Sequence, residues 1–256
     1  MKWRQSAVRL SKYTKCERME RNMTLHHQNG YSSYYMHNCK PSLASRVSFY
    51  VRKQMFHLFM QTMCPTEATS ILDLGVTCDK TYQESNYFEQ FYPYRENIVC
   101  AGIEDGSHLQ HQYPGVVFIP LQAGQPLPFS DKQFDISFCS AVIEHAGNRQ
   151  EQHFLIKEML RVSQHFFLTT PNRWFPIEMH TGLPLLHYLP MQCYRSILTN
   201  TKFRYWSYES NLNLLDIENL RNIFLPYVVA NLVKIRLLGI PSNLVAYGKS
   251  PAWVNS

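Results

Sequence analysis

The chain has 256 residues, of which 45% are hydrophobic, as is typical of one α/β domain with extensions. Its seven cysteines form no Cys-x-x-Cys pair, which favours a reducing compartment and indicates no zinc site. It contains no run of eighteen apolar residues, and its basic N-terminus lacks the apolar middle of a secretory signal. These features exclude a spanning helix, and we expect a cytoplasmic protein.

Charge is unevenly distributed along the chain. Residues 1–53 carry eleven Lys and Arg against two acids, a net charge of +9, and the rest carries 25 − 11 = 14 basic and 19 − 2 = 17 acidic residues, a net −3. We therefore expect residues 1–42 to form a basic arm. Such an arm can bind nucleic acid, anionic lipid or an acidic partner, and it can equally be a solvated extension.

Residues 43–64 are expected to form an N-terminal helix. Apolar residues recur at helical spacing from Val47 to Met63, and Cys64-Pro65-Thr66 ends the pattern. Further helices are expected over 82–92 and 148–162. Five apolar runs are each typical of a buried strand: residues 70–75, 98–103, 116–119, 134–139 and 165–170.

The alternation of strands with helices predicts a Rossmann-type α/β core over residues 65–172, with a mostly parallel sheet. In such sheets, ligands bind beyond the carboxyl ends of the strands, at the point where the strand order reverses. Cys100 and Cys139 lie within two of the apolar runs and are expected to be small buried side chains. The residues that follow each strand are therefore the candidates for a binding site.

The final part of the chain, residues 173–256, has a different composition. It opens with the Pro- and His-rich loop PNRWFPIEMHTGLPLLHYLP, and a long apolar segment over residues 217–239 predicts a helix. Two roles are open for this helix: packing against the domain or a partner, or lying at the inner surface of a membrane as a peripheral contact.

A glycine ends the first predicted strand, and two acids follow the second. Gly75 would allow a tight turn and close approach of a ligand, and a helix starting after it would direct N–H groups at a carboxylate. Glu104 closes the second strand, where an acid can accept both hydroxyls of a ribose, and Asp105 competes for that role. Each also has a plainer interpretation, as a turn glycine or an exposed loop acid.

Five motifs stand in order between residues 70 and 172: ILDLG, GIED, LPFSDKQFD, SAVIEH and FFLTTPN. Together they resemble the S-adenosylmethionine-dependent methyltransferases of the type 11 family, and the loop after them resembles a bacterial subgroup of that family. The resemblance implies a doubly wound, seven-stranded sheet and S-adenosylmethionine as cofactor. It places Asp73 and Gly75 near the methionine part of the cofactor, and Glu104 on its ribose.

The same resemblance assigns residues at the end of the fourth strand. It places Ser140 and Ala141 close to the cofactor, with Glu144 and His145 just beyond them. His145 is the candidate base that removes a proton from the acceptor. Glu144 either orients His145 or is a structural acid. The plainer interpretation of His145 is a histidine at a helix start that bonds to the backbone.

The sequence departs from the family pattern at two places. The family continues Gly-x-Gly-x-Gly, whereas Gly75 is followed by Val76-Thr77-Cys78-Asp79, so Thr77 offers a hydroxyl where glycine would allow close approach. The family usually has an acid about four residues before LPF that binds the adenine amine. Ala123 stands there, with Gln122 beside it. Gln122 either supplies that contact or the contact is lost.

The loop after the fifth strand carries Glu178, His180 and His187. No metal is expected, because His180 and His187 lack a standard ligand spacing. The loop is either a lid over the acceptor, with an aromatic wall, or a packed segment. The wall would consist of Trp174, Phe175 and Tyr188.

The fourth strand is followed by Ser140-Ala141-Val142-Ile143 rather than by the Asn/Asp-Pro-Pro-aromatic motif that accompanies methylation of nucleic-acid bases. A small-molecule, glycan or lipid-linked acceptor is therefore expected, and nucleic acid is not. Two alternatives remain: a catalytically silent protein that serves as an interaction scaffold, and an RNA methyltransferase that uses the basic arm.

Overall fold

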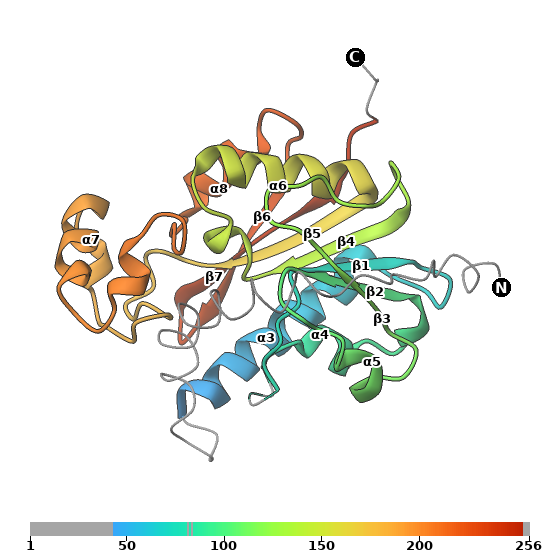
Figure 1. Cartoon of the computed structure of the whole chain (residues 1–256), viewed down its shortest axis with the longest axis horizontal. Coiled ribbons are helices and arrows are strands. Elements are labelled where there is room, and N and C mark those ends of the chain that lie inside the picture. The colour runs from blue at the N-terminus through green and yellow to red at the C-terminus, as the bar shows by residue number, and fades with distance from the viewer. Residues whose placement is uncertain (1–42, 81, 83, 253–256) are drawn as a thin grey trace, which may run out of the picture. The chain divides into compact units, whose positions relative to one another are not determined.

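A seven-stranded sheet forms the centre of the computed structural model, which describes residues 43–80, 82 and 84–252 (Figure 1). The predicted basic arm, residues 1–42, lies outside the described residues. The strand order is β3-β2-β1-β4-β5-β7-β6. The strands are β1 (Ile71–Leu74), β2 (Ile98–Gly102), β3 (Val117–Pro120), β4 (Phe134–Ser140), β5 (Ser163–Pro171), β6 (Asn231–Leu237) and β7 (Ile240–Lys249).

The sheet is parallel from β3 to β5, and only β7 pairs antiparallel with its neighbours β5 and β6. This confirms the predicted mostly parallel, doubly wound fold. All four residues of β1 are buried, as expected for a central parallel strand covered on both faces. The chain leaves β1 for β2 on one side and returns to β4 on the other, so the strand order reverses at the carboxyl end of β1.

Helices cover both faces of the sheet (Figure 1). One face carries α6 (Arg149–Val162) and α8 (Ile217–Phe224), and the other carries α3 (Leu43–Met63), α4 (Tyr87–Phe91) and α5 (Leu109–Gln112). The helices predicted over 43–64 and over 148–162 each differ from the observed helices by one residue. Cys100 and Cys139 are buried free thiols, as predicted.

Helix α3 belongs to the core because of its aromatic residue Phe59. This side chain is fully buried, and its ring lies 5.5 Å from that of Phe138 on β4 and 5.3 Å from that of Phe167 on β5, both edge-on. Edge-to-face pairs at this separation are favourable beyond their burial alone. The N-terminal helix is therefore fixed to the centre of the sheet.

The start of α6 fixes the turn that precedes it. The Asn148 side chain accepts hydrogen bonds from the backbone N–H groups of Gln150 and Glu151, at 2.8 and 3.1 Å, and the Glu151 carboxylate accepts from the Asn148 N–H at 2.7 Å. This reciprocal capping box satisfies N–H groups that a helix start otherwise leaves free. It holds the one-turn helix η3 (Ile143–His145) at the carboxyl end of β4.

Residues 172–216 form a separate layer between β5 and α8, which projects beyond the sheet as the orange segment of Figure 1. We call it, after the role expected from the sequence, the acceptor-side segment. It contains η4 (Leu186–Tyr188), α7 (Met191–Thr199) and η5 (Arg204–Ser207). It has a small core of its own, formed by Tyr194, Leu198, Trp206, Leu212 and Leu214.

Two predicted helices are wrong in extent. The helix predicted over 82–92 is reduced to α4, which begins at Tyr87. The long helix predicted over 217–239 ends at Phe224, and β6 occupies residues 231–237 as an edge strand. Pro226 cannot continue a helix, and β-branched residues follow it. The helix on which the expected membrane contact depended is therefore absent, and no described helix is long and apolar enough to span a bilayer.

Replacing Phe59 by Ala tests the packing of α3. Because the side chain is fully buried between two strands, we expect Phe59→Ala to lower the free energy of unfolding by about 3–5 kcal/mol. Urea denaturation measures this. Phe154→Ala on the exposed side of α6 is the matched control and should cost much less. A loss at Phe59 no larger than in the control would show that α3 does not belong to the core.

Candidate functional site

The carboxyl end of β1 turns at Gly75, as predicted. Its φ of +94° suits glycine, and a Cβ here would lie 2.2 Å from Cγ2 of Val142. The N–H groups of Gly75 and Val76 donate to the carbonyl of Ala101 on β2, at 2.7 and 3.3 Å. The turn therefore holds the ends of β1 and β2 against the segment that follows β4.

The helix expected immediately after Gly75 is not there, and an irregular loop takes its place. Asn86 fixes this loop from both sides: its side-chain oxygen accepts from the Thr77 N–H at 2.9 Å, and its side-chain nitrogen donates to the Thr77 carbonyl at 2.8 Å. Asn86 adopts a left-handed conformation, with φ of 51°, which asparagine tolerates better than most residues. No motif or spacing in the sequence singles out Asn86.

Glu104 lies just beyond β2 and faces the loop. Its Oε2 accepts from the Thr77 hydroxyl at 2.8 Å and from the Cys78 N–H at 3.1 Å. Partial burial, followed by the charge of Glu104, raises the pKa of the Cys78 thiol to about 11. The exposed Asp105 instead accepts from the Ser107 N–H at 2.9 Å, which lowers its pKa. Of the two acids, Glu104 is the one directed at the glycine turn.

Asp73 is buried beneath the turn rather than exposed to a ligand. Burial, followed by the charge of the neighbouring buried acid Glu89, raises the pKa of Asp73 well above its ordinary value. The Cys100 thiol donates to Glu89 Oε1 at 2.8 Å. A protonated Asp73 that donates to Glu89 accounts for this arrangement, so Asp73 supports the turn from below.

Ser140 and Ala141 border the same edge of the sheet at the end of β4. The Ser140 hydroxyl lies 2.8 Å from the Thr169 hydroxyl and 3.2 Å from the Tyr87 hydroxyl. Ala141 has a φ of +56°, an uncommon conformation for alanine, and its N–H donates to the Thr169 carbonyl at 2.9 Å. Gln122 and Ala123 lie exposed in the loop after β3.

A chain of hydrogen bonds joins η3 to the acceptor-side segment. Glu178 Oε1 lies 2.7 Å from His180 Nδ1, His180 Nε2 lies 3.1 Å from His145 Nε2, and His145 Nδ1 lies 2.8 Å from the Asn211 carbonyl. The second oxygen of Glu178 accepts from the Thr181 N–H at 2.7 Å. We call Glu178, His180 and His145 the acid–imidazole chain.

The partners of the acid–imidazole chain determine where its protons lie. His145 must donate from Nδ1 to a carbonyl, so its Nε2 can only accept, and His180 Nε2 must be the donor between the rings. Burial alone would raise the pKa of Glu178, but the bonds and charge of His180 lower it to about 2. Burial likewise opposes a charge on His180, yet Glu178 raises the pKa of His180 above its usual value.

The charge on His180 in turn affects its neighbour. Burial, followed by the charge of His180, lowers the pKa of His145. In the acid–imidazole chain, Glu178 is therefore a carboxylate, His180 an imidazolium and His145 a neutral imidazole. His145 bonds to the backbone in the manner of the plainer interpretation given above, and neither of its ring nitrogens is free.

Glu144 lies beside this chain and is fully buried. Its Oε2 accepts from the Thr170 hydroxyl of β5 at 2.9 Å. Its Oε1 is also buried and has no hydrogen-bond partner among the described residues. A buried carboxylate oxygen without a partner is costly, so this side chain is a candidate for binding a ligand.

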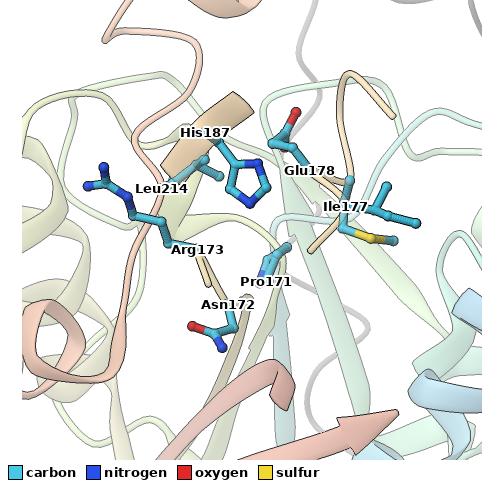
Figure 2. A pocket seen from close by; sticks show the side chains of 8 residues that line it. Pro171, Asn172, Arg173, Ile177, Glu178, His187 and Leu214 are labelled. Atoms are coloured by element: carbon cyan, nitrogen blue, oxygen red, sulfur yellow. The ribbon is translucent and has the colours of Figure 1, made fainter. Parts of the chain in front are cut away.

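Of the three polar residues predicted on the loop, Glu178 and His180 meet, whereas His187 is separate from His180. His180 faces His145, whereas His187 Nε2 contacts the Phe175 carbonyl at 2.8 Å. Figure 2 shows His187 and Glu178 lining a small pocket with Pro171 and Asn172 at the end of β5. In the predicted aromatic wall, the Tyr188 hydroxyl donates to the Trp174 carbonyl at 2.7 Å, and both side chains are exposed.

Comparisons with known proteins agree with this geometry. Residues 91–165, from the end of α4 to the start of β5, match the type 11 family described as "Methyltransferase domain". The sequence matches no curated protein at a significant level. Residues 91–165 are therefore similar to the methyltransferase-domain family, and the cofactor that this family implies is S-adenosylmethionine.

Solved structures with a similar fold are distant in sequence. PH0226 from Pyrococcus horikoshii OT3 is 17% identical, with a TM-score of 0.56 over 87% of this chain and 100% of that one. An S-adenosylmethionine-dependent methyltransferase from Aquifex aeolicus is 10% identical, with a TM-score of 0.50 over 76% and 89%. The N-methyltransferase NodS from Bradyrhizobium japonicum WM9 is 10% identical, with a TM-score of 0.50 over 81% and 98%. These likenesses establish the Rossmann-like methyltransferase fold.

The buried acids below the turn predict a pH-dependent stability. Because the folded-state pKa of Asp73 is raised, the unfolded chain releases its proton first as the pH rises above about 3.8, and the free energy of unfolding then falls. Asp73→Asn removes the ionisable group and with it this fall in the free energy of unfolding. We expect the variant to gain stability relative to wild type as the pH rises above about 4, by at most about 1.4 kcal/mol per pH unit.

Urea denaturation of both proteins across this range measures the difference. Glu67→Gln replaces an exposed acid at the opposite end of β1 and serves as the matched control. Parallel stability profiles for wild type and Asp73→Asn would contradict the burial of an acid pair beneath the turn.

Proposed function

We propose that the protein transfers a methyl group from S-adenosylmethionine to a small-molecule, glycan or lipid-linked acceptor. The observation that carries this proposal is the placement of the Glu104 carboxylate against the glycine turn, within the segment that matches the methyltransferase-domain family. An acid at the end of the second strand, beside a turn that only glycine can make, is suited to binding a ribose next to backbone N–H groups.

The residues at this edge fit the cofactor in two respects. Both donors to Glu104 reach Oε2. Among the described residues none donates a hydrogen bond to Oε1, which is therefore available to a ribose hydroxyl. Thr77 replaces a glycine of the family pattern, yet the two bonds from Asn86 give the loop a defined shape. We infer that Gly75, Thr77 and Glu104 bind the cofactor, with Asp73 supporting the turn.

Further cofactor contacts follow from the same placement. We assign Ser140 and Ala141 to the edge of the cofactor site because they end the strand next to β1. Gln122 and Ala123 lie in the loop after β3, where the adenine would be bound, and the exposed Gln122 amide is the candidate partner of the adenine amine. Asp105 is the less favoured acid, because it bonds within its own turn.

Bound S-adenosylmethionine supplies an electrophilic methyl group on a sulfonium. What this chain must supply is alignment and, for a weakly acidic acceptor, removal of a proton. We propose His145 as the group that accepts this proton, with Glu144 beside it. For that role, His145 Nε2 must exchange its bond from His180 for one from the acceptor. An acceptor that is already a good nucleophile needs the alignment alone.

The acceptor-side segment indicates an acceptor with an apolar part. Of the sixteen large hydrophobic side chains that are exposed in the described part of the chain, seven lie between residues 174 and 197. Concentrated exposure of this kind is typical of binding surfaces. The seven residues are Trp174, Ile177, Met179, Leu185, Tyr188, Leu189 and Ile197.

A second candidate function is an interaction scaffold that does not methylate. Two departures from the family pattern favour this alternative: Thr77 stands where glycine would allow a ligand to approach the backbone closely, and Ala123 stands where an acid usually binds the adenine amine. The RNA methyltransferase alternative depends on the basic arm, which lies outside the described residues.

Cofactor binding separates the enzyme from the scaffold. Calorimetric titration of the full chain with S-adenosylmethionine and S-adenosylhomocysteine should give micromolar affinity, and Glu104→Ala should weaken it at least tenfold because two ribose hydrogen bonds are lost. Glu67→Ala, at the opposite end of β1, is the matched control and should bind like wild type. No binding by the folded wild-type protein would remove the enzyme proposal and leave the scaffold.

A further inference from the structure

Three side chains with metal-binding groups meet between η3 and the acceptor-side segment. They are Glu144 and His145, at the carboxyl end of β4, and His180, in the loop after β5. One potential ligand atom from each lies within 4.8 Å of the other two. Glu144 and His180 are buried, and His145 is partly buried. The three residues therefore form a compact, largely enclosed cluster with two nitrogen donors and one oxygen donor.

The two imidazole nitrogens already have the spacing of metal ligands. His145 Nε2 and His180 Nε2 are 3.1 Å apart. In a tetrahedral zinc site with Zn–N distances of about 2.0–2.1 Å, two ligand nitrogens are about 3.3 Å apart. An ion can therefore bind both rings with little movement, and the carboxylate needs to approach by roughly 1.5 Å at most.

Both rings are oriented by partners on their other nitrogens. His180 Nδ1 bonds to the Glu178 carboxylate at 2.7 Å, and His145 Nδ1 bonds to the Asn211 carbonyl at 2.8 Å. A histidine that binds a metal almost always donates its other N–H to a carboxylate or a backbone carbonyl, which fixes the ring and the tautomer. Each of these two histidines has one such partner.

The carboxylate of Glu144 is likewise held by a partner on one of its two oxygens. Glu144 Oε2 accepts from the Thr170 hydroxyl at 2.9 Å, which holds the side chain in place. Its Oε1 is buried and has no hydrogen-bond partner among the described residues. A metal ion would satisfy this oxygen, which neither the fold nor the acid–imidazole chain otherwise explains.

We propose that Glu144, His145 Nε2 and His180 Nε2 bind a divalent transition-metal ion of the zinc type. Two imidazoles and one carboxylate suit such ions, whereas Mg²⁺ and Ca²⁺ prefer sites made of oxygen ligands. The Trp206 ring packs at a tilt beside both imidazoles, with centroid distances of 5.7 Å to His145 and 4.9 Å to His180. The ion replaces the proton between the two Nε2 atoms, and this proton goes to solvent.

The ion would join the turn after β4 to the acceptor-side segment and so fix that segment over the end of the sheet. The inference contradicts the expectation of no metal, which considered His180 with His187 rather than with His145. It also restricts the proposed function: while the ion is bound, His145 Nε2 is a ligand and cannot act as the base, so the metal-bound protein would methylate only acceptors that need alignment alone. Metal binding is measured without S-adenosylmethionine, so its outcome is independent of whether the cofactor binds.

The test is a titration of the untagged full chain with Zn²⁺ and with Co²⁺ as a spectroscopic probe. We expect one ion per chain. The Co²⁺ spectrum should show the d–d bands of a four- or five-coordinate ion and no thiolate charge-transfer band. The absence of that band separates this site from the exposed thiols Cys64, Cys78 and Cys193. His145→Gln and His180→Gln should each weaken binding at least 100-fold. Glu178→Gln should weaken it about 10–100-fold through the lost orienting bond.

His57→Gln changes an exposed histidine on α3 outside the cluster and is the matched control, which should bind like wild type. Zn²⁺ should raise the melting temperature of wild type and of the control but not of His145→Gln. Equal binding by wild type and both cluster variants, or no stoichiometric ion in wild type, would overturn the proposal. If the variants do not fold, anomalous diffraction from wild-type crystals at the zinc edge decides, because the ion must lie between Glu144, His145 and His180.

Discussion

The close contact between Gly75 and Val142 is the constraint on which the rest of the site depends. β1 is a fully buried central strand, and its chain must leave the sheet at a point already occupied by the segment after β4. Only glycine meets both demands, because its φ is positive and a Cβ would collide with Val142. The contact sets the glycine turn next to the segment that continues into Glu144 and His145, so the edges that we propose for the cofactor and for the acceptor are neighbours.

Polar groups buried around this contact oppose stability but give the site its shape. Asp73 and Glu89 lie beneath the turn with raised pKa values, and Glu144 keeps an oxygen without a partner in the described part of the chain. Such groups are retained where function requires them, because apolar residues would fill the same space at lower cost. Their concentration at the carboxyl edge of one sheet supports placing the function there.

Most of the fold could be predicted from the sequence, because five strands appear as apolar runs and α3 has a clear helical period. The segment 217–239 could not, because helix α8, a turn and edge strand β6 together form one continuous apolar stretch. Gly75 and Glu104 could be found from their positions after strands. The contact of His145 with His180 could not, because 35 residues separate them and nothing in their spacing indicates that the loop folds back onto η3.

We propose that the edge formed by Gly75, Glu104 and Ser140 binds S-adenosylmethionine. A crystal structure of the full chain with S-adenosylhomocysteine at saturating concentration would show this site. We expect the ribose hydroxyls on Glu104 and the amino-acid end of the ligand at the Gly75 turn. Ligand density elsewhere on the molecule, or none at this edge in well-ordered crystals, would contradict it.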